Sequence, residues 1–466
     1  MEEKVKAEMV EELRKIVGGD WVVTERDLMI DYLRDETADP VCPTPSLDTV
    51  LVKPLTTGEV SKILKLANKL MVPVFPAGGR TGLVGGSIPV KPGIILSLER
   101  MNKIEIDRDN LMAIAGAGVT LSDLIKAAED ADLFFPLHPG DEGAQIGGLI
   151  AANAGGVRAV KYGVMRSYVK GLEVVLPTGE ALNLGGELLK NNAGYDLMNL
   201  VIGSEGTLCV ITKAVIRLYP KTRFSVSLLI PFENGRDAIK SVPEILQAGI
   251  IPLAIEYMET EGLKKTAEHL NEEWPTLEGE AQLLLILTGM NEDELLSECE
   301  QISEICQKNN SSEAVLAETR EEQDKILKVR SNIYTVMKPE VYDILDVTVP
   351  PSKLAMLVDR INEIEERHGI RLPIYGHAGD GNLHVHIMWD EGRAVEYAED
   401  VKREVYGASS VLGGVITGEH GIGRTRVKDF SFFVDKKEIE LMKAIKKIFD
   451  PNGILNPGKV LELNAD

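Results

Sequence analysis

Three glycine-rich loops in the first half of the chain constrain its fold more than any other feature of the sequence. They are PAGGRTGLVGGS at residues 76–87, HPGDEGAQIGGLIAANAGG at 138–156 and VIGSEGTLCVIT at 201–212. Closely spaced glycines let backbone N–H groups approach a pyrophosphate without obstruction by Cβ atoms. A single loop of this kind is as readily a tight surface turn, but three in one region favour one extended phosphate-bearing ligand.

The loops match neither of the common nucleotide-binding motifs. No G-x-G-x-x-G sequence opens a helix, and no Gly-Lys-Ser/Thr follows the first loop, so neither a Rossmann fingerprint nor a P-loop is predicted. The second and third loops instead combine small residues with side chains that can reach an extended cofactor, namely Asp141, Asn153, Arg158 and Glu205.

The order of predicted elements divides the 466 residues into three regions. Residues 50–76 show strand, helix and strand patterns and lead directly into the first loop, so residues 1–221 are predicted to form one α/β domain. Residues 222–425 alternate apolar strands with helices in a repeated β-α-β order, which predicts a ferredoxin-like antiparallel sheet backed by helices. Residues 426–466 are predicted to form a C-terminal segment that contains the helical stretch KKEIELMKAIKKIF.

Charge and composition argue against several classes of function. The chain has 73 acidic and 51 basic side chains and a net charge of −22, whereas binding to nucleic acids or anionic membranes requires a basic footprint. The four cysteines show no C-x-x-C spacing, so an iron–sulfur cluster or zinc ribbon within the chain is not predicted. The N-terminus lacks the apolar core of a secretory signal, and no run approaches 18 apolar residues. We therefore expect a cytoplasmic protein without a transmembrane segment.

Histidines concentrate in one short part of the chain. Only seven occur, and four of them are His377, His384, His386 and His420. His384 and His386 lie two apart in a predicted strand and therefore share a face, while Glu419 precedes His420 in the glycine-bracketed turn GEHGIG. A lone histidine is more often a buried residue bonded to a backbone carbonyl. A cluster with an adjacent carboxylate favours a catalytic zinc, iron or manganese site.

The combined motifs resemble the FAD-linked oxidases of the vanillyl-alcohol oxidase type. The glycine-rich loops, with YGVMRSYVKGLEVVLPTGE and KNNAGYDLMNLVIGSEGTL, carry a resemblance that extends from about residue 40 to Lys459. Within the family, the chain resembles the branch of D-lactate dehydrogenases, glycolate oxidase FAD subunits and D-2-hydroxyglutarate dehydrogenases. The implied α+β fold has an FAD-binding domain of the PCMH type, a ferredoxin-like substrate (cap) domain and a helical C-terminal segment that returns to the FAD site.

The resemblance also implies which residues bind FAD. Carried over by position, they are Pro76, Gly78, Gly79, Arg80, Thr81, Gly82, Gly85, Gly86, Ser87, Pro139, Gly140, Asp141, Gly147, Gly148, Asn153, Gly156, Tyr162, Gly163, Glu205, Gly206, Ile211 and Asn456. Members that attach flavin covalently use a histidine or cysteine in these loops. The first loop has neither and His138 only precedes the second, so we expect dissociable FAD. Cys209 replaces the glycine usual in this branch, and we expect only a small change in packing near the flavin.

For the chemistry, the resemblance implies His377, His384 and Glu419 as metal ligands and His420 as the active-site base. His386 departs from the hydroxyglutarate branch, which has asparagine there, and is left as either a fourth ligand or a substrate contact. Arg330 matches the arginine that binds the substrate carboxylate, although by position alone it is as readily a helix-surface residue.

The expected reaction is oxidation of a small D-2-hydroxy acid by FAD with a divalent metal, and D-lactate is favoured over glycolate. The hydroxyglutarate enzymes have a lysine where this chain has Ile344, which disfavours a substrate with a second carboxylate. The alternatives are a D-2-hydroxyglutarate dehydrogenase, an oxygen-reacting oxidase of alcohols, sugars or aryl ethers, and a flavin subunit that only relays electrons. Without cysteine clusters, electrons must pass to an external acceptor: a quinone, an iron–sulfur subunit or an electron-transfer flavoprotein.

Overall fold

The first glycine-rich loop leaves the edge of a small parallel sheet in the computed structural model, which describes residues 3–462. The sheet has the order β1-β2-β4-β3, with β1 antiparallel to β2 and the other pairs parallel. Its strands are β1 (Val22–Val23), β2 (Thr49–Val52), β3 (Val74–Ala77) and β4 (Gly93–Ser97), and its helices are α1 (Glu3–Val17) and α2 (Thr57–Leu70). The predicted threonine start of α2 is present as a capping box between Thr56 and Glu59.

The other two loops belong to a five-stranded antiparallel sheet of order β5-β6-β10-β8-β9. Its strands are β5 (Ile104–Asp107), β6 (Met112–Gly116), β8 (Val169–Val175), β9 (Ala181–Gly185) and β10 (Val210–Arg217), and a separate pair is β7 (Leu133–Phe134) with β11 (Tyr219–Pro220). The associated helices are α3 (Leu121–Asp130), α4 (Ile146–Ala152), α5 (Ala159–Tyr162), α6 (Met165–Tyr168) and α7 (Leu197–Val201).

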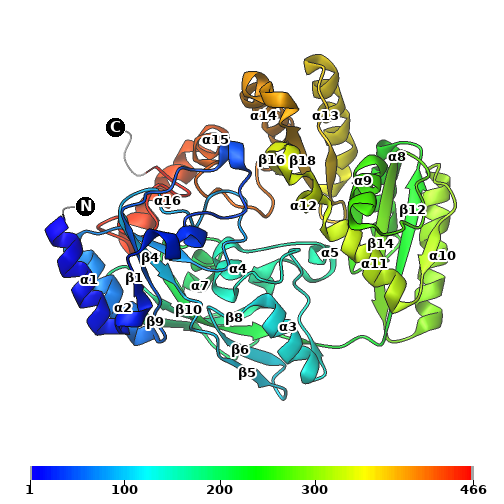
Figure 1. Ribbon diagram of the computed structural model, residues 1–466. Helices are drawn as coiled ribbons and strands as arrows, with labels where there is room; N and C mark the ends of the chain where they lie inside the picture. The colour runs from blue at the N-terminus through cyan, green and yellow to red at the C-terminus, as the bar shows by residue number, and fades with distance from the viewer. Residues whose placement is uncertain (1–2, 463–466) are drawn as a thin grey trace.

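The second body is one seven-stranded antiparallel sheet of order β15-β12-β14-β13-β17-β18-β16 (Figure 1). The strands are β12 (Phe224–Phe232), β13 (Ala254–Glu259), β14 (Ala281–Gly289), β15 (Val315–Ala317), β16 (Val341–Thr348), β17 (Ile374–His377) and β18 (Asn382–Met388). The predicted antiparallel sheet backed by helices is confirmed, and it includes the histidine strands.

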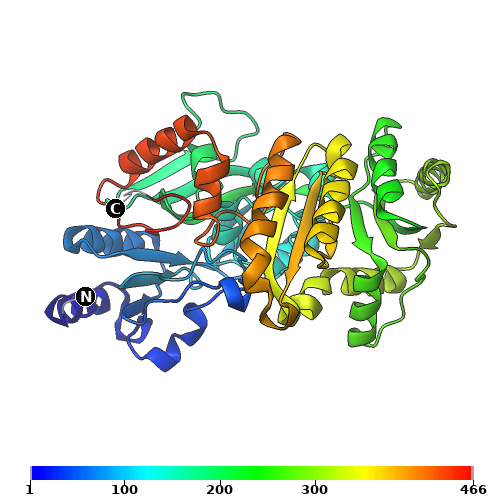
Figure 2. The same ribbon diagram turned by 90° about the horizontal axis from the view of Figure 1, so that it is seen from above.

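The two faces of this sheet have different coverings. One face packs its apolar side chains on α8 (Gly235–Gln247), α10 (Glu292–Lys308), α13 (Leu354–His368) and α14 (Ala394–Val411). The other packs in part on α9 (Thr260–Leu270), α11 (Arg320–Ser331) and α12 (Ile333–Met337). Seen from above, α13 and α14 lie across the near face of the sheet (Figure 2). The second face also carries the histidines, so they lie on the side away from α13 and α14.

The C-terminal segment returns to the first domain after α15 (Val427–Phe433) and α16 (Lys436–Phe449). Leu455 forms a parallel bridge with Val74, and the Lys446 ammonium donates to the carbonyls of Thr207 and Leu455. Residues 454–456 therefore lie against β3, the strand that leads into the first glycine-rich loop. Among residues 3–462, no helix combines the length and apolar character that a membrane span requires.

Candidate active site

A single cleft joins the glycine-rich loops to the GEHGIG turn. The predicted cofactor residues that line it are Pro76, Gly78, Gly79, Arg80, Thr81, Gly82, Gly86, Ser87, Pro139, Asp141, Gly147, Gly148, Glu205, Gly206, Ile211 and Asn456. Those outside its wall are Gly85, Gly140, Asn153, Gly156, Tyr162 and Gly163. Among the latter, Asn153 accepts the backbone N–H of Arg166 and the Tyr162 ring packs near Phe134 and Tyr219, so their side chains support the loops.

The cleft fits a pyrophosphate because the first loop presents unpaired donors to it. Within residues 3–462, the backbone N–H groups from Gly79 to Val84 donate to no protein acceptor, although all six residues line the cleft. Unpaired backbone N–H groups in residues that line a cleft are available to a ligand rich in acceptors, such as a pyrophosphate. The Arg80 guanidinium lies over the Tyr32 ring at 4.2 Å and donates to the Gly78 carbonyl, which fixes a positive charge beside the loop.

Gly148 in α4 also indicates that the cleft holds a ligand, because a glycine has no side chain to fill it. No heavy atom lies within 4 Å of the position that its Cβ would occupy, and its φ is not positive. Glycine inside a helix costs about 0.5–1 kcal/mol relative to alanine, and protein packing here gives no reason for it. Space for a ligand in the cleft does give one.

Glu205 ties the third loop to the GEHGIG turn. Its carboxylate accepts the backbone N–H groups of Ile422 at 2.8 Å and Gly423 at 2.7 Å. Asn456 donates its side-chain N–H to the carbonyls of Glu205 and Gly86, which brings the C-terminal segment to the same point. Burial raises the pKa of Glu205, against the opposing effect of these N–H donors. The cofactor loops and the histidine region are thus linked directly by hydrogen bonds.

Strand register gathers the polar residues of the cap onto one sheet face. Glu256 lies opposite His377, and His384 lies opposite both Tyr375 and Asp346. Because alternate residues share a face, His386 lies on this face too, opposite Ile344. Glu256 and Asp346 were not identified from the sequence. The signal was an acidic residue inside an otherwise apolar strand, in PLAIEYM and in ILDVTVP.

His377, His384 and Glu419 converge as the resemblance implied. Nε2 of His377 lies 3.2 Å and Nε2 of His384 lies 3.5 Å from the same Glu419 oxygen, and one ligand atom from each residue falls within 4.8 Å of the others. Burial lowers the pKa of His384, whereas the carboxylates of Glu256 and Glu419 raise the pKa of His377 against its burial. Although burial opposes it, the neighbouring His377, His384 and His420 hold the pKa of Glu419 at about 2. Two imidazoles and a carboxylate form a ligand set that fits zinc, iron(II) or manganese, provided that each ring gives up the proton on its ligating nitrogen.

Asp346 builds the turn that holds Glu419 and His420. Its Oδ2 accepts the backbone N–H groups of Gly418, Glu419 and His420, each at 2.8 Å. Its Oδ1 accepts from Asn382 at 2.8 Å and lies 3.5 Å from Nδ1 of His384. One buried carboxylate therefore fixes a predicted ligand, the predicted base and the ring of a second ligand.

Arg330 is buried rather than on a helix surface, with 7% of the residue exposed. Its Nε donates to Oε2 of Glu256 at 2.8 Å, and its Nη2 bonds the same oxygen. Its Nη1 group has no hydrogen-bond partner within the described residues.

His386 does not join the metal-ligand group. The two sets of converging ligand atoms found among residues 3–462 leave it out. Its Nδ1 contacts the Pro373 carbonyl at 3.1 Å, and its buried Nε2 has no partner there. Its ring stacks on Tyr375 at 5.0 Å, and Tyr375 also meets the His384 ring at 5.2 Å. This geometry does not support the role of a fourth ligand.

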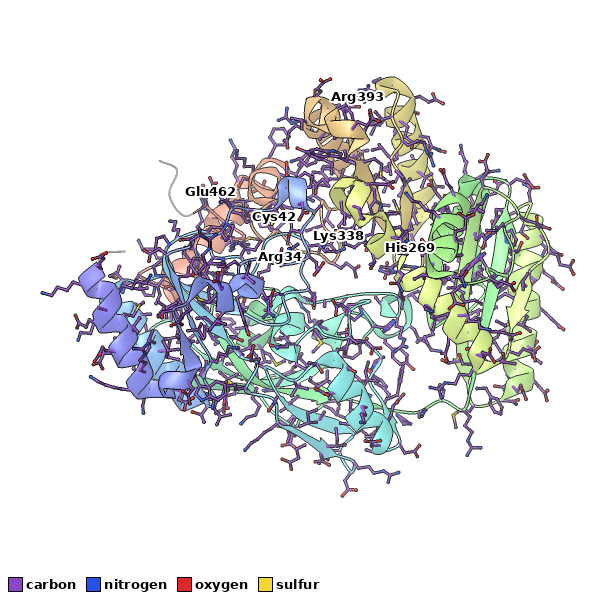
Figure 3. All side chains as sticks on the ribbon, in the orientation of Figure 1. Arg34, Cys42, His269, Lys338, Arg393 and Glu462 are labelled. Atoms are coloured by element: carbon purple, nitrogen blue, oxygen red, sulfur yellow. The ribbon has the colours of Figure 1, made fainter. Side chains whose placement is uncertain are left out.

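His269 and His368 stand apart from this cluster. His269 is exposed on α9 (Figure 3), and His368 contacts Glu404 at 3.0 Å. Figure 3 also marks Lys338 near Arg34 and Cys42, where the cap meets the N-terminal segment, and Lys338 forms an ion pair with Glu36 there.

Comparison with known proteins agrees with the fold and the cleft. Residues 221–460 match the family described as "FAD linked oxidases, C-terminal domain", and residues 49–185 match "FAD binding domain". The D-lactate dehydrogenase of Archaeoglobus fulgidus is 46% identical, covering 92% of this chain and 95% of the relative. The glycolate oxidase subunit GlcD of Bacillus subtilis is 38% identical, covering 90% of each chain.

Among solved structures, p-cresol methylhydroxylase with substrate bound is similar in fold, with a TM-score of 0.80 at 19% identity, covering 100% of this chain and 98% of that one. The likeness confirms the PCMH-type α+β architecture. Together, the matching domains, the near full-length relatives and the cofactor cleft show that the chain belongs to the FAD-linked oxidases, as an FAD-binding oxidoreductase of the vanillyl-alcohol oxidase type.

Proposed function

We propose that this protein is an FAD- and metal-dependent dehydrogenase that oxidises a small D-2-hydroxy acid, preferably D-lactate, to the 2-oxo acid. The observation that carries the proposal is the composition of the cleft wall. Glu419 and His420 line the same cleft as the glycine-rich loops, so a substrate held by the histidine cluster adjoins the cofactor. The relatives named D-lactate dehydrogenase and glycolate oxidase subunit support this class of substrate.

Bound flavin accepts a hydride, and a bound divalent ion acts as a Lewis acid that makes a hydroxyl group more acidic. His377, His384 and Glu419 would hold the ion. Nη1 of Arg330 would bind the substrate carboxylate, a charge-assisted contact that orients Cα. His420 would take the hydroxyl proton, a task suited to an imidazole near neutral pH.

Ile344 supports a monocarboxylate substrate. It is 7% exposed, and it lies opposite His386 on the sheet face that carries the histidine cluster. Its apolar side chain offers no charge to a second carboxylate. D-lactate and glycolate therefore suit this side of the site better than 2-hydroxyglutarate.

We expect the FAD to be dissociable. Cys209 lines the cleft, but burial raises the pKa of its thiol to about 12, which disfavours the nucleophilic thiolate. Hot acid or denaturant should release the yellow flavin into the supernatant. Flavin that stays with precipitated protein would contradict this expectation.

The electron acceptor is proposed to be an external protein or quinone. Cys299 and Cys306 are buried on α10 in the cap core and Cys42 and Cys209 lie elsewhere, so the described residues hold no cysteine cluster. An iron–sulfur subunit or an electron-transfer flavoprotein would serve, and the word "subunit" in the name of the Bacillus relative fits an assembly.

Metal removal tests the proposal at the level of one half-reaction. Anaerobic protein treated with a chelator should keep its FAD but lose flavin reduction by D-lactate, and zinc, iron(II) or manganese should restore it. Full reduction in a verified metal-free preparation would contradict the metal role. Hydrogen peroxide at each aerobic turnover would favour an oxidase, and no reduction by any hydroxy acid would favour an electron-relay subunit.

A further inference from the structure

Glu256 contacts both His377 and Arg330 and has no role in the chemistry described above. It lies in β13 between apolar neighbours and is 1% exposed. Its Oε1 lies 2.8 Å from Nδ1 of His377, and its Oε2 accepts from Nε of Arg330 at 2.8 Å and from Nη2. Both carboxylate oxygens are thus used: one contacts His377, a proposed metal ligand, and the other contacts Arg330, which is proposed to bind the substrate.

We propose that Glu256 is a positioning residue that fixes the ring of His377 for metal binding and, through Arg330, sets the substrate carboxylate relative to that metal. The inference rests on the proposed function, because that function supplies the roles of His377 and Arg330. It adds a link between them, so that metal affinity and substrate affinity depend on one buried carboxylate.

The first part follows from the two nitrogens of the imidazole. Glu256 accepts a hydrogen bond from Nδ1, so when a metal ion displaces the proton at Nε2 the lone pair on that nitrogen becomes available to the ion. Nε2 of His377 is the atom that faces Glu419, at 3.2 Å. A carboxylate on the far nitrogen orients a ligating ring and increases its basicity, and loss of such a partner weakens metal binding about 10–100-fold.

The second part follows from the geometry of the guanidinium. Glu256 engages Nε and Nη2, which fixes the plane of the group and leaves Nη1 free within the described residues. The ring of Tyr375 lies 5.0 Å from the guanidinium carbon and limits its movement on another side. The contact between Glu256 and His377 follows from strand register, because the two residues lie directly opposite each other on β13 and β17.

β13 also offers a control in a second, less buried ion pair. Glu259, on the same strand, pairs with Arg371 at 3.1 Å but does not contact His377. If Glu256 only neutralises a buried arginine, then Glu256→Gln and Glu259→Gln should differ in stability and in nothing else. If Glu256 positions the ligand, only Glu256→Gln should change metal affinity.

The experiment uses the full-length, FAD-loaded protein and measures manganese or zinc affinity by competition with a chelator. Glu256→Gln and Glu256→Ala should bind the ion about 10–100-fold more weakly, with FAD content unchanged and with kcat partly restored by excess metal. Both should also raise KM for D-lactate. Arg330→Met should raise KM while metal affinity stays close to that of the wild type, and Glu259→Gln should change neither.

Two results would overturn the inference in distinguishable ways. If the wild-type protein takes up no divalent ion, the metal has no part in the proposed function and this inference fails with it. Wild-type protein that binds the ion, beside folded Glu256→Gln and Glu256→Ala variants that bind it equally well, overturns the role of Glu256 alone. The melting temperature and FAD content of each variant establish that it is folded.

Discussion

The imidazole rings of His384 and His420 lie parallel, with 4.9 Å between their centroids and 4° between their planes. The ring nitrogens of His420 stay 4.0 Å from Asp346 and 3.9 Å from Glu419, so the ring is placed by stacking and by its backbone bond to Asp346. His420→Ala should therefore retain FAD and metal. Flavin reduction by D-lactate should slow by about 100-fold or more, since the general base is lost. Stopped-flow measurement of the reductive half-reaction checks this, and mildly alkaline pH should partly restore the rate.

Glu419→Ala is the matched comparison for His420→Ala. It should lose metal along with activity, and added metal should restore part of both. The geometry also contains a second possible ligand group, Asp346 with His384 and His420. Loss of metal from His420→Ala would favour that group, and a normal rate of flavin reduction would move the base role elsewhere, with His386 the next candidate.

Gly148→Ala tests the cofactor cleft. The added methyl would occupy space that the protein leaves open, so FAD should bind at least several-fold more weakly while the fold persists. Gly262→Ala is the control, because Gly262 is also helical and also has nothing within 4 Å of its Cβ position, but does not line the cleft. Fluorescence titration of the apoproteins with FAD measures both. Equal affinities in the two variants would place the cofactor away from α4.

Ile344→Lys should shift substrate preference. A lysine at this position would add a cation beside His386, so the ratio of kcat/KM for D-2-hydroxyglutarate to that for D-lactate should rise by about tenfold or more. Ile344→Met, of similar length and without charge, should leave the ratio close to that of the wild type. An unchanged ratio in a folded Ile344→Lys protein would show that this position does not face the substrate.

His138 should make the protein less stable in mild acid. Burial, with added repulsion from Arg158 and Arg330, lowers the pKa of His138 to about 4, against about 6.5 in an unfolded chain. Between these values the unfolded chain binds a proton that the folded protein does not, so stability falls as pH drops from about 6.5 to about 4. His138→Gln removes this contribution. Its melting temperature should therefore fall less between pH 7 and pH 5 than that of the wild type, and an equal fall would refute the assignment.

Local sequence signals were enough to identify the glycine-rich loops and the main strands and helices, and the family resemblance then implied residues of which most line the cleft. The loops are recognisable because glycine spacing is a local property, and the capping box of α2 depends on residues three apart. Because strand residues two apart share a face, the position of His386 beside His384 also followed from sequence.

The contacts of Arg330, Glu256 and Asp346 could not be predicted in the same way. Glu256 and Arg330 are 74 residues apart, as are Asp346 and His420, so only the packing of α11 and of the GEHGIG turn against the sheet brings them together. An acidic residue in an apolar strand indicates that a buried partner is needed, but the sequence does not say which residue it is. For the same reason, the sequence did not distinguish Arg330 in the site from a surface arginine.

Anaerobic mixing of the FAD- and metal-loaded protein with D-lactate and with L-lactate tests the central claim most directly. D-lactate should bleach the flavin completely, with one equivalent consumed per FAD, and the L enantiomer should react at least about tenfold more slowly because its hydride faces away from the flavin. Glycolate should react and D-2-hydroxyglutarate should react poorly. A flavin that stays oxidised with both D-lactate and glycolate, or that L-lactate reduces as fast as D-lactate, would contradict the account.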